Sequence, residues 1–142
     1  MVDRPVEYLD VEDLIALAGD LLGDPPPIAD VGLLGSAAAR PATTVFGEDA
    51  YPDIWTKAAS LLQSLVKNHP LVDGNKRLGW LATAVFLDLN GASMSRMSND
   101  AVYELVMRVA AGHDSVESIA AQLHSLRGRR RAPSSSDPTR RA

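Results

Sequence analysis

Helix-breaking residues divide this chain into short segments. Pro25–Pro27, Pro41 and Pro70 cannot continue an α-helix, and the pair Asn90–Gly91 is typical of a left-handed helix end. Between these stops, apolar residues recur at intervals of three or four positions, which is the spacing of a helix that buries one face. We therefore expect an all-α fold, a compact bundle of about six helices with at most a small β-hairpin.

Capping residues indicate where several of these helices begin. Asp10, Asp53, Ser98 and Ser115 each precede an apolar run, and their side chains can accept hydrogen bonds from first-turn amides. Residues 42–52 have no helical period and are predicted to form a loop or small hairpin. The predicted helices cover residues 11–22, 30–40, 53–68, 75–90, 98–109 and 115–123.

The third and fourth predicted helices differ in their patterning. In the third, one apolar stripe alternates with polar positions that are expected to face solvent: Lys57, Ser60, Ser64 and Lys67. The fourth is apolar on nearly every side. We therefore expect the fourth helix to be the central buried one.

Charge is unevenly distributed along the chain. Residues 127–142 contain six arginines and one aspartate, although the formal net charge of the whole chain is -4. This stretch has no apolar residue larger than alanine, so we interpret it as a disordered Arg-rich tail. Residues 1–126 are expected to form one domain, because a chain of this size supports a single core. The acidic body predicts no nucleic-acid binding except through the tail.

Composition also excludes some kinds of site. The chain has no cysteine, so disulfides, thiolate metal sites and cysteine nucleophiles are excluded. The first residues lack a basic segment followed by an apolar run, and the longest apolar stretch, Trp80–Leu89, is short and contains Asp88. We therefore expect a cytoplasmic protein that does not enter a membrane.

Chemically active residue types concentrate between His69 and Arg77. This segment reads His-Pro-Leu-Val-Asp-Gly-Asn-Lys-Arg and lies where the fourth predicted helix begins. A helix N-terminus has free backbone N–H groups and the positive end of the helix dipole, and both favour an anion. Lys76 and Arg77 oppose that dipole, which is unfavourable unless an anion is bound beside them. The pattern predicts an anion site.

The remaining residues of the segment indicate that the anion is a nucleotide phosphate. Gly74 lets the backbone approach a phosphate closely, and Asp73 is suited to the Mg²⁺ that accompanies a polyphosphate. His69 is the group here that can take a proton from an attacking hydroxyl near neutral pH. A lone histidine before a proline more often only ends a helix, but the neighbours of His69 favour a catalytic role.

The segment resembles the signature of the Fic/Doc family. That signature is His-x-Phe-x-Asp/Glu-Gly-Asn-Gly-Arg-x-x-Arg in the Fic branch and His-x-Phe-x-Asp/Asn-Ala/Gly-Asn-Lys-Arg in the Doc (death-on-curing) branch. Lys76 stands at the second glycine of the Fic form and Trp80 at its final arginine, so both differences favour the Doc branch. Leu71 replaces the usual phenylalanine. The resemblance covers roughly half of the chain, from Asp30 to Gly91.

This resemblance implies a function as well as a fold. It implies a toxin of a type II toxin–antitoxin pair that binds ATP and Mg²⁺ and is restrained by a separate Phd-like antitoxin. Doc-type members transfer the γ-phosphate of ATP to a threonine of elongation factor Tu and block translation. Carried over by position, the catalytic base is His69, the metal ligand is Asp73, and the phosphate ligands are Gly74, Asn75, Lys76 and Arg77.

Two alternatives to a kinase remain open. Fic-type members transfer AMP, but the side chain of Lys76 fills space that a glycine leaves for the α-phosphate, and no second arginine is present to clamp the β- and γ-phosphates. These two differences disfavour AMP transfer. The other alternative is a non-catalytic remnant that only binds its antitoxin.

Residues outside the segment receive simpler interpretations. By the resemblance, residues 42–51 correspond to the flap that aligns the target backbone. Thr44 and Glu48 have the spacing of the helix-borne inhibitory motif of self-restrained Fic proteins, but Pro41 and Gly47 break any helix there. We interpret that spacing as coincidence. His113 and His124 are expected to be isolated surface residues. Trp55, Trp80 and Phe86 are expected to pack in the core.

Overall fold

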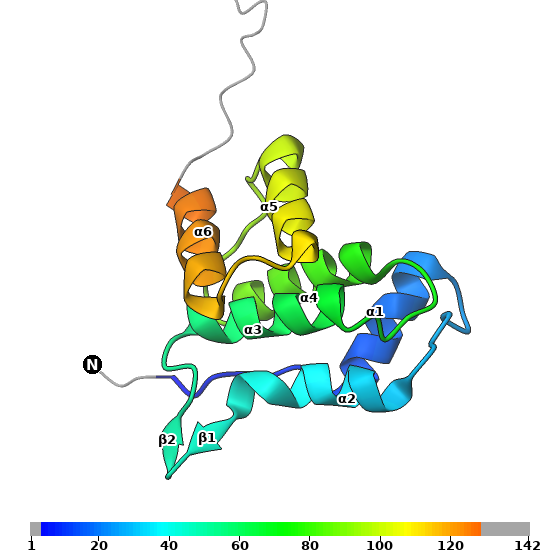
Figure 1. Cartoon of the computed structure of the whole chain (residues 1–142), viewed down its shortest axis with the longest axis horizontal. Coiled ribbons are helices and arrows are strands. Elements are labelled where there is room, and N and C mark those ends of the chain that lie inside the picture. The colour runs from blue at the N-terminus through cyan, green and yellow to red at the C-terminus, as the bar shows by residue number, and fades with distance from the viewer. Residues whose placement is uncertain (1–3, 129–142) are drawn as a thin grey trace, which may run out of the picture.

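The computed structural model describes residues 4–128 and confirms the helical fold. The described part contains six α-helices, a short 3₁₀ helix and one two-stranded hairpin (Figure 1). Most of the predicted tail lies outside the described residues. The elements are α1 Val11–Leu22, α2 Val31–Ala39, η1 Arg40–Ala42, β1 Thr44–Val45, β2 Glu48–Asp49, α3 Ile54–Lys67, α4 Asn75–Leu89, α5 Asn99–Ala111 and α6 Val116–Gly128.

The predicted capping residues begin the helices. Asp10 accepts a hydrogen bond from the amide of Asp13, 2.8 Å away, and the Asp13 carboxylate accepts one from the amide of Asp10. Asp53 caps α3 in the same reciprocal way. Ser98 and Ser115 accept from amides in the first turns of α5 and α6, each at 3.1 Å. These side chains satisfy amides that a helix leaves free at its start.

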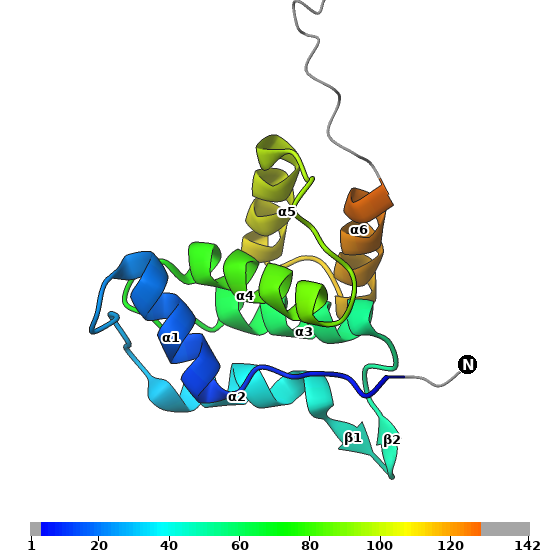
Figure 2. The ribbon, with the colours of Figure 1, turned by 180° about the vertical axis from the view of Figure 1, so that it is seen from behind.

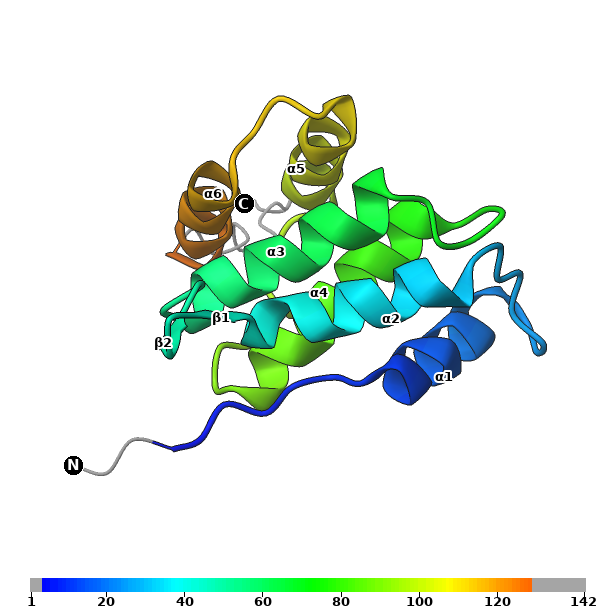
Figure 3. The same ribbon diagram turned by 60° about the horizontal axis from the view of Figure 1, so that its bottom comes forward.

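The central helix is α3, so the prediction that the fourth helix is innermost was wrong. α3 contacts α2, α4, α5 and α6, whereas α4 contacts α1, α3 and α5 (Figures 1 and 3). On α4, the side chains of Trp80, Leu81 and Val85 are only partly buried. Figure 2 shows α1 against the other side of α4, where it also meets α2.

The polar face predicted for α3 was also wrong in part. Lys67 is exposed as expected, but Lys57, Ser60 and Ser64 are buried. Each has a hydrogen-bond partner: Nζ of Lys57 donates to the carbonyl of Tyr51 at 2.6 Å, Oγ of Ser60 donates to the carbonyl of Lys57 at 2.7 Å, and Oγ of Ser64 accepts from Nη1 of Arg40 at 3.0 Å. Buried polar groups are tolerated when they are hydrogen-bonded in this way. The pattern within α3 alone could not indicate a partner from η1.

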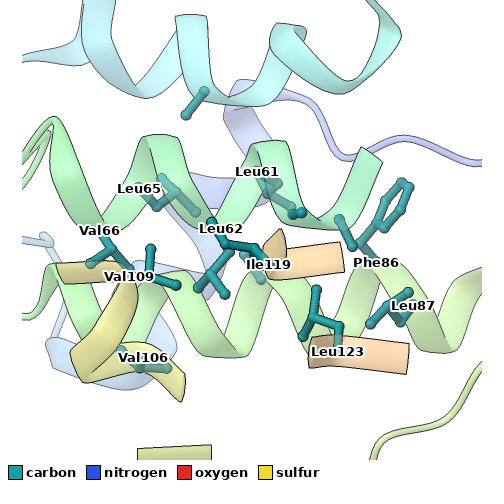
Figure 4. Close-up of a cluster of buried hydrophobic side chains, with 14 of the residues drawn as sticks. Leu61, Leu62, Leu65, Val66, Phe86, Leu87, Val106, Val109, Ile119 and Leu123 are labelled. Atoms are coloured by element: carbon teal, nitrogen blue, oxygen red, sulfur yellow. The ribbon is translucent and has the colours of Figure 1, made fainter. Parts of the chain in front are cut away.

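Aliphatic side chains carry the core, as the low aromatic content predicts. The side chains labelled in Figure 4 come from α3, α4, α5 and α6, and α1 and α2 also contribute buried residues to the core. Phe86 is the buried aromatic ring among them. The labelled members are Leu61, Leu62, Leu65, Val66, Phe86, Leu87, Val106, Val109, Ile119 and Leu123.

Two exposed turns lie at opposite ends of α3. The β1–β2 hairpin precedes the helix and the segment with the active residue types follows it (Figure 1). Fourteen helical residues separate them, which is a length of about 21 Å. Among the described residues, no helix is both long and apolar enough to cross a membrane.

Candidate active site

The site begins where α3 turns into an exposed loop. Asn68 ends the helix with helical backbone angles, and His69 then adopts a positive φ of 54°. A residue in this conformation just after a helix end is usually glycine, because a side chain there costs free energy. The chain nevertheless places a histidine there, with its side chain exposed and Pro70 buried behind it. The imidazole is therefore presented at the surface by a constrained backbone.

The loop is fixed by backbone pairing with residues between α1 and α2. Ile28 and Leu71 form an antiparallel bridge, and the amide of Val72 donates to the carbonyl of Pro27 at 2.8 Å. The amide of Ala29 donates to the carbonyl of Pro70, also at 2.8 Å. Leu71, which replaces the usual phenylalanine, is 2% exposed and so still anchors the loop in the core.

Asn75 holds the loop from the helix side. Its Oδ1 accepts from the amide of Leu71 at 2.9 Å, and its Nδ2 donates to the carbonyl of the same residue at 3.0 Å. Nδ2 also lies 3.4 Å from Nδ1 of His69. Asn75 is buried, and its carboxamide is already satisfied by the loop. These contacts fix the backbone of Leu71, two residues after His69, and the predicted role of Asn75 in phosphate binding stays a prediction.

Gly74 has a backbone conformation that favours glycine, and its predicted role in phosphate binding stays a prediction. It caps α4 with a φ of 90°, and a Cβ built there would lie 2.6 Å from Cδ1 of Leu22. The left-handed conformation disfavours a side chain here, and a Cβ would also force the end of the Leu22 side chain to move. Gly74 offers no side-chain acceptor, so no capping side chain occupies the first-turn amides of α4.

These residues surround an open hollow of about 350 Å³. Its lining includes exposed side chains of both signs, with Lys76 and Arg77 on α4 and Asp73 just before it. Within residues 4–128, the ion pairs are Lys57–Asp49 and Arg108–Asp114, so neither cation is paired. The full lining is His69, Val72, Asp73, Gly74, Asn75, Lys76 and Arg77.

The hollow has the chemistry of an anion site. Unpaired cations, free amides and the positive end of the α4 dipole converge on it, which favours phosphate oxygens. The described residues contain no cluster of three or more potential metal-ligating side chains. Asp73 alone fits a Mg²⁺ that arrives with a nucleotide, because Mg²⁺ typically takes one or two carboxylates and fills its remaining positions with phosphates and water.

Sequence reasoning misplaced the segment next to this site. Residues 42–51 do form a hairpin, but they lie at the far end of α3 and do not line the hollow (Figure 1). The segment that pairs with the loop is instead residues 23–30. The signal for it was available in Pro25–Pro27, since a run of prolines favours extended backbone before Ile28.

The remaining candidates lie away from the hollow. His113 is exposed, and His124 stacks edge-on against Trp55 with ring centroids 4.9 Å apart. Thr44 and Glu48 sit on different strands of the hairpin, so the helix-borne inhibitory pattern is absent from that segment. Phe86 is buried in the core as predicted, and Trp55 and Trp80 are partly buried and pack against the core.

Comparison with known proteins places this helical fold and its anion hollow in a family. A family model described as the Fic/DOC family matches residues 8–87, more than half of the chain, and the chain belongs to the Fic/Doc family. It is also 47% identical over 118 residues to a protein named Toxin Doc from Mycolicibacterium smegmatis. That match covers 82% of this chain and 91% of the relative. Members of the family are generally transferases that use ATP.

Proposed function

We propose that this chain is the toxin of a toxin–antitoxin pair and acts as a Doc-like protein kinase that transfers the γ-phosphate of ATP to a protein hydroxyl. The observation that carries the proposal is the hollow at the start of α4, where unpaired Lys76 and Arg77 lie with Asp73 and an exposed His69. The likeness to a protein named Toxin Doc supports it.

Phosphate transfer is favoured over AMP transfer by two positions on α4. Lys76 occupies the place of a glycine in the Fic form and adds a cation to the lining of the hollow. Trp80, one turn along the helix, occupies the place of the second arginine and lines an apolar groove between α1, α4 and α5. With no cation at that position, the β- and γ-phosphates lack the clamp that would expose the α-phosphate to attack.

The step assigns one task to each group. His69 takes the proton of the target hydroxyl, the hydroxyl oxygen forms a bond to the γ-phosphorus, and the bond from that phosphorus to the β,γ-bridging oxygen breaks to release ADP. Lys76 and Arg77, with the α4 amides, hold the phosphates and offset their charge. Asp73 would hold Mg²⁺, which when bound further neutralises the phosphates.

The target and partners follow by analogy with Doc-type proteins. We propose a threonine of elongation factor Tu as the acceptor, with arrest of translation in the cytoplasm as the result. We assign this activity to residues 1–126. A Phd-like antitoxin is proposed to restrain it.

Labelled nucleotides test the reaction directly. Purified protein is incubated with elongation factor Tu, Mg²⁺ and ATP labelled at either the α- or the γ-phosphate. We expect label in the protein target only from γ-labelled ATP. Label from α-labelled ATP alone would overturn the kinase and favour AMP transfer, which is the second candidate.

A pair of histidine variants tests the non-catalytic alternative. His69→Ala should abolish both labelling and growth arrest, whereas His113→Ala, at an exposed histidine outside the hollow, should change neither. Growth arrest that persists in His69→Ala would favour a remnant that acts only by binding.

A further inference from the structure

The tip of the β1–β2 hairpin carries an aromatic residue that the fold does not use. Phe46 and Gly47 form its two-residue turn, with φ values of 52° and 80°, between the paired residues Val45 and Glu48. A turn with positive φ at both positions strongly prefers Asn-Gly. A bulky residue in this conformation is an outlier, and Phe46 is also fully exposed. Neither local conformation nor burial accounts for a phenylalanine here.

The hairpin is held rigidly by a buried cation. Lys57 is 1% exposed, and its Nζ donates to the carbonyl of Tyr51 at 2.6 Å and lies 3.2 Å from Oδ2 of Asp49 in β2. The amide of Ala50 donates to the carbonyl of Thr43 at 2.8 Å and closes the base of the hairpin. A contact made by such a preorganised tip loses less conformational entropy on binding.

An apolar groove lies elsewhere on the molecule. It measures about 550 Å³ and runs between Leu21 of α1, Trp80 of α4 and Val102, Tyr103 and Met107 of α5. Tyr103 is 65% exposed and Met107 is 40% exposed, so large apolar side chains line it without being covered. Lys76 and Arg77 also line this groove.

The tip and the groove are complementary in size and charge. A benzene ring fits a cavity of roughly 150 Å³, so the groove has room for the ring of Phe46 together with Val45. Glu48, the exposed residue that follows the turn, carries a negative charge, while Lys76 and Arg77 are among the residues that line the groove. Opposite charges beside an apolar contact fix its orientation.

We propose that the hairpin tip of one copy of this chain docks in the α1–α4–α5 groove of a second copy. The hairpin lies at the opposite end of α3 from the start of α4, so one molecule cannot bring its own tip to its own groove (Figure 1). The contact is head-to-tail: each copy that joins brings a free tip and a free groove. Such an interface either closes into a ring or continues as an open chain, so in both cases the average mass rises with concentration.

Sedimentation velocity with two complementary variants tests the proposal. Phe46→Ser removes the tip and Met107→Glu places a carboxylate in the groove; both residues are exposed, so both variants should fold, which circular dichroism checks. Small interfaces are weak, so the concentration series extends to about 1 mM. We expect the average mass of the wild-type chain to rise at least about twofold over this range, while each variant alone stays a monomer.

Mixing the two variants gives the decisive result. The intact tip of Met107→Glu can dock in the intact groove of Phe46→Ser, but nothing can add further, so the mixture should form dimers and no larger species. Val31→Ser, which changes an exposed apolar residue on α2, should associate like the wild type. A wild-type chain that stays monomeric, or a mixture that forms no dimer, overturns the proposal. This outcome is independent of the kinase assay.

Discussion

The turns at the two ends of α3 both contain residues with positive φ but expose different chemistry. Each combines a glycine with a larger residue at positive φ: His69 and Gly74 after the helix, and Phe46 and Gly47 before it. Both larger residues are exposed. Unfavourable conformations that the surrounding structure maintains tend to mark functional sites. The turn after α3 is therefore charged and suited to a phosphate, whereas the turn before α3 exposes an apolar ring suited to a protein surface.

The two turns are also anchored by different polar residues. Asn75 binds the backbone of Leu71 through both atoms of its carboxamide, whereas Lys57 binds the hairpin through an ion pair and the carbonyl of Tyr51. Each anchor is buried beside an exposed residue. The anchors fix the positions of the exposed residues, and those residues provide the chemistry.

Replacing His69 should produce the largest effect and show that only the turn after α3 takes part in phosphate transfer. His69→Ala is expected to lower phosphate transfer by about 10²- to 10⁴-fold, because a general base contributes that much. Phe46→Ser, at the equivalent place in the other turn, should leave transfer at low protein concentration unchanged. Initial rates with γ-labelled ATP measure both. Equal losses in the two variants would contradict the separation.

The two turn glycines should differ in how much stability they provide. Alanine at either position must adopt a left-handed conformation, which costs about 1–2 kcal/mol. Gly74→Ala must also displace the Leu22 side chain, whereas a Cβ at Gly47 meets nothing within 4 Å. We expect the free energy of unfolding to fall by about 2–5 kcal/mol for Gly74→Ala and about 1–2 kcal/mol for Gly47→Ala. Urea unfolding measures both, and equal losses would show that Leu22 yields freely.

Replacing either anchor should lower the free energy of unfolding by a similar amount, but only one of the two replacements should lower the transfer rate. Asn75→Ala leaves the Leu71 backbone unpaired and Lys57→Met leaves the Tyr51 carbonyl unpaired, so each should cost about 1–3 kcal/mol of unfolding free energy. Asn75→Ala should also reduce transfer, because the loop that carries His69 is released. Lys57→Met should retain the wild-type rate per folded molecule. A rate that falls with Lys57→Met would connect the hairpin to catalysis.

Local sequence signals were sufficient for most of the fold. Caps such as Asp10 and Asp53 and stops such as Pro70 act within a few residues of themselves, so helix positions follow from short windows. Burial does not. Lys57 and Ser64 are buried because Asp49, Tyr51 and Arg40 reach them from outside α3, and such partners are set by tertiary packing.

In the candidate site, too, local features were predictable from the sequence and tertiary contacts were not. The residues that line the hollow all lie between positions 69 and 77, so one motif was enough to bring them together. The pairing of Ile28 with Leu71 joins residues more than forty positions apart, and no periodicity links them. The carboxamide of Asn75 shows a further limit, because residue type indicates what a side chain can bind but not which neighbour already occupies it.

The smallest effect is expected for a substitution of Phe46, the exposed aromatic residue at the hairpin tip. Phe46→Asn should raise the free energy of unfolding by up to about 1 kcal/mol, because asparagine adopts the left-handed turn more readily and no buried contact is lost. Thermal unfolding at low concentration measures the gain, with Thr43→Asn as a control outside the turn. The same variant should lose the concentration-dependent rise in mass. A variant less stable than the wild type would show that Phe46 already packs within its own molecule. A gain in stability together with lost association would mean that the wild-type chain keeps a less stable turn because the exposed ring binds another copy.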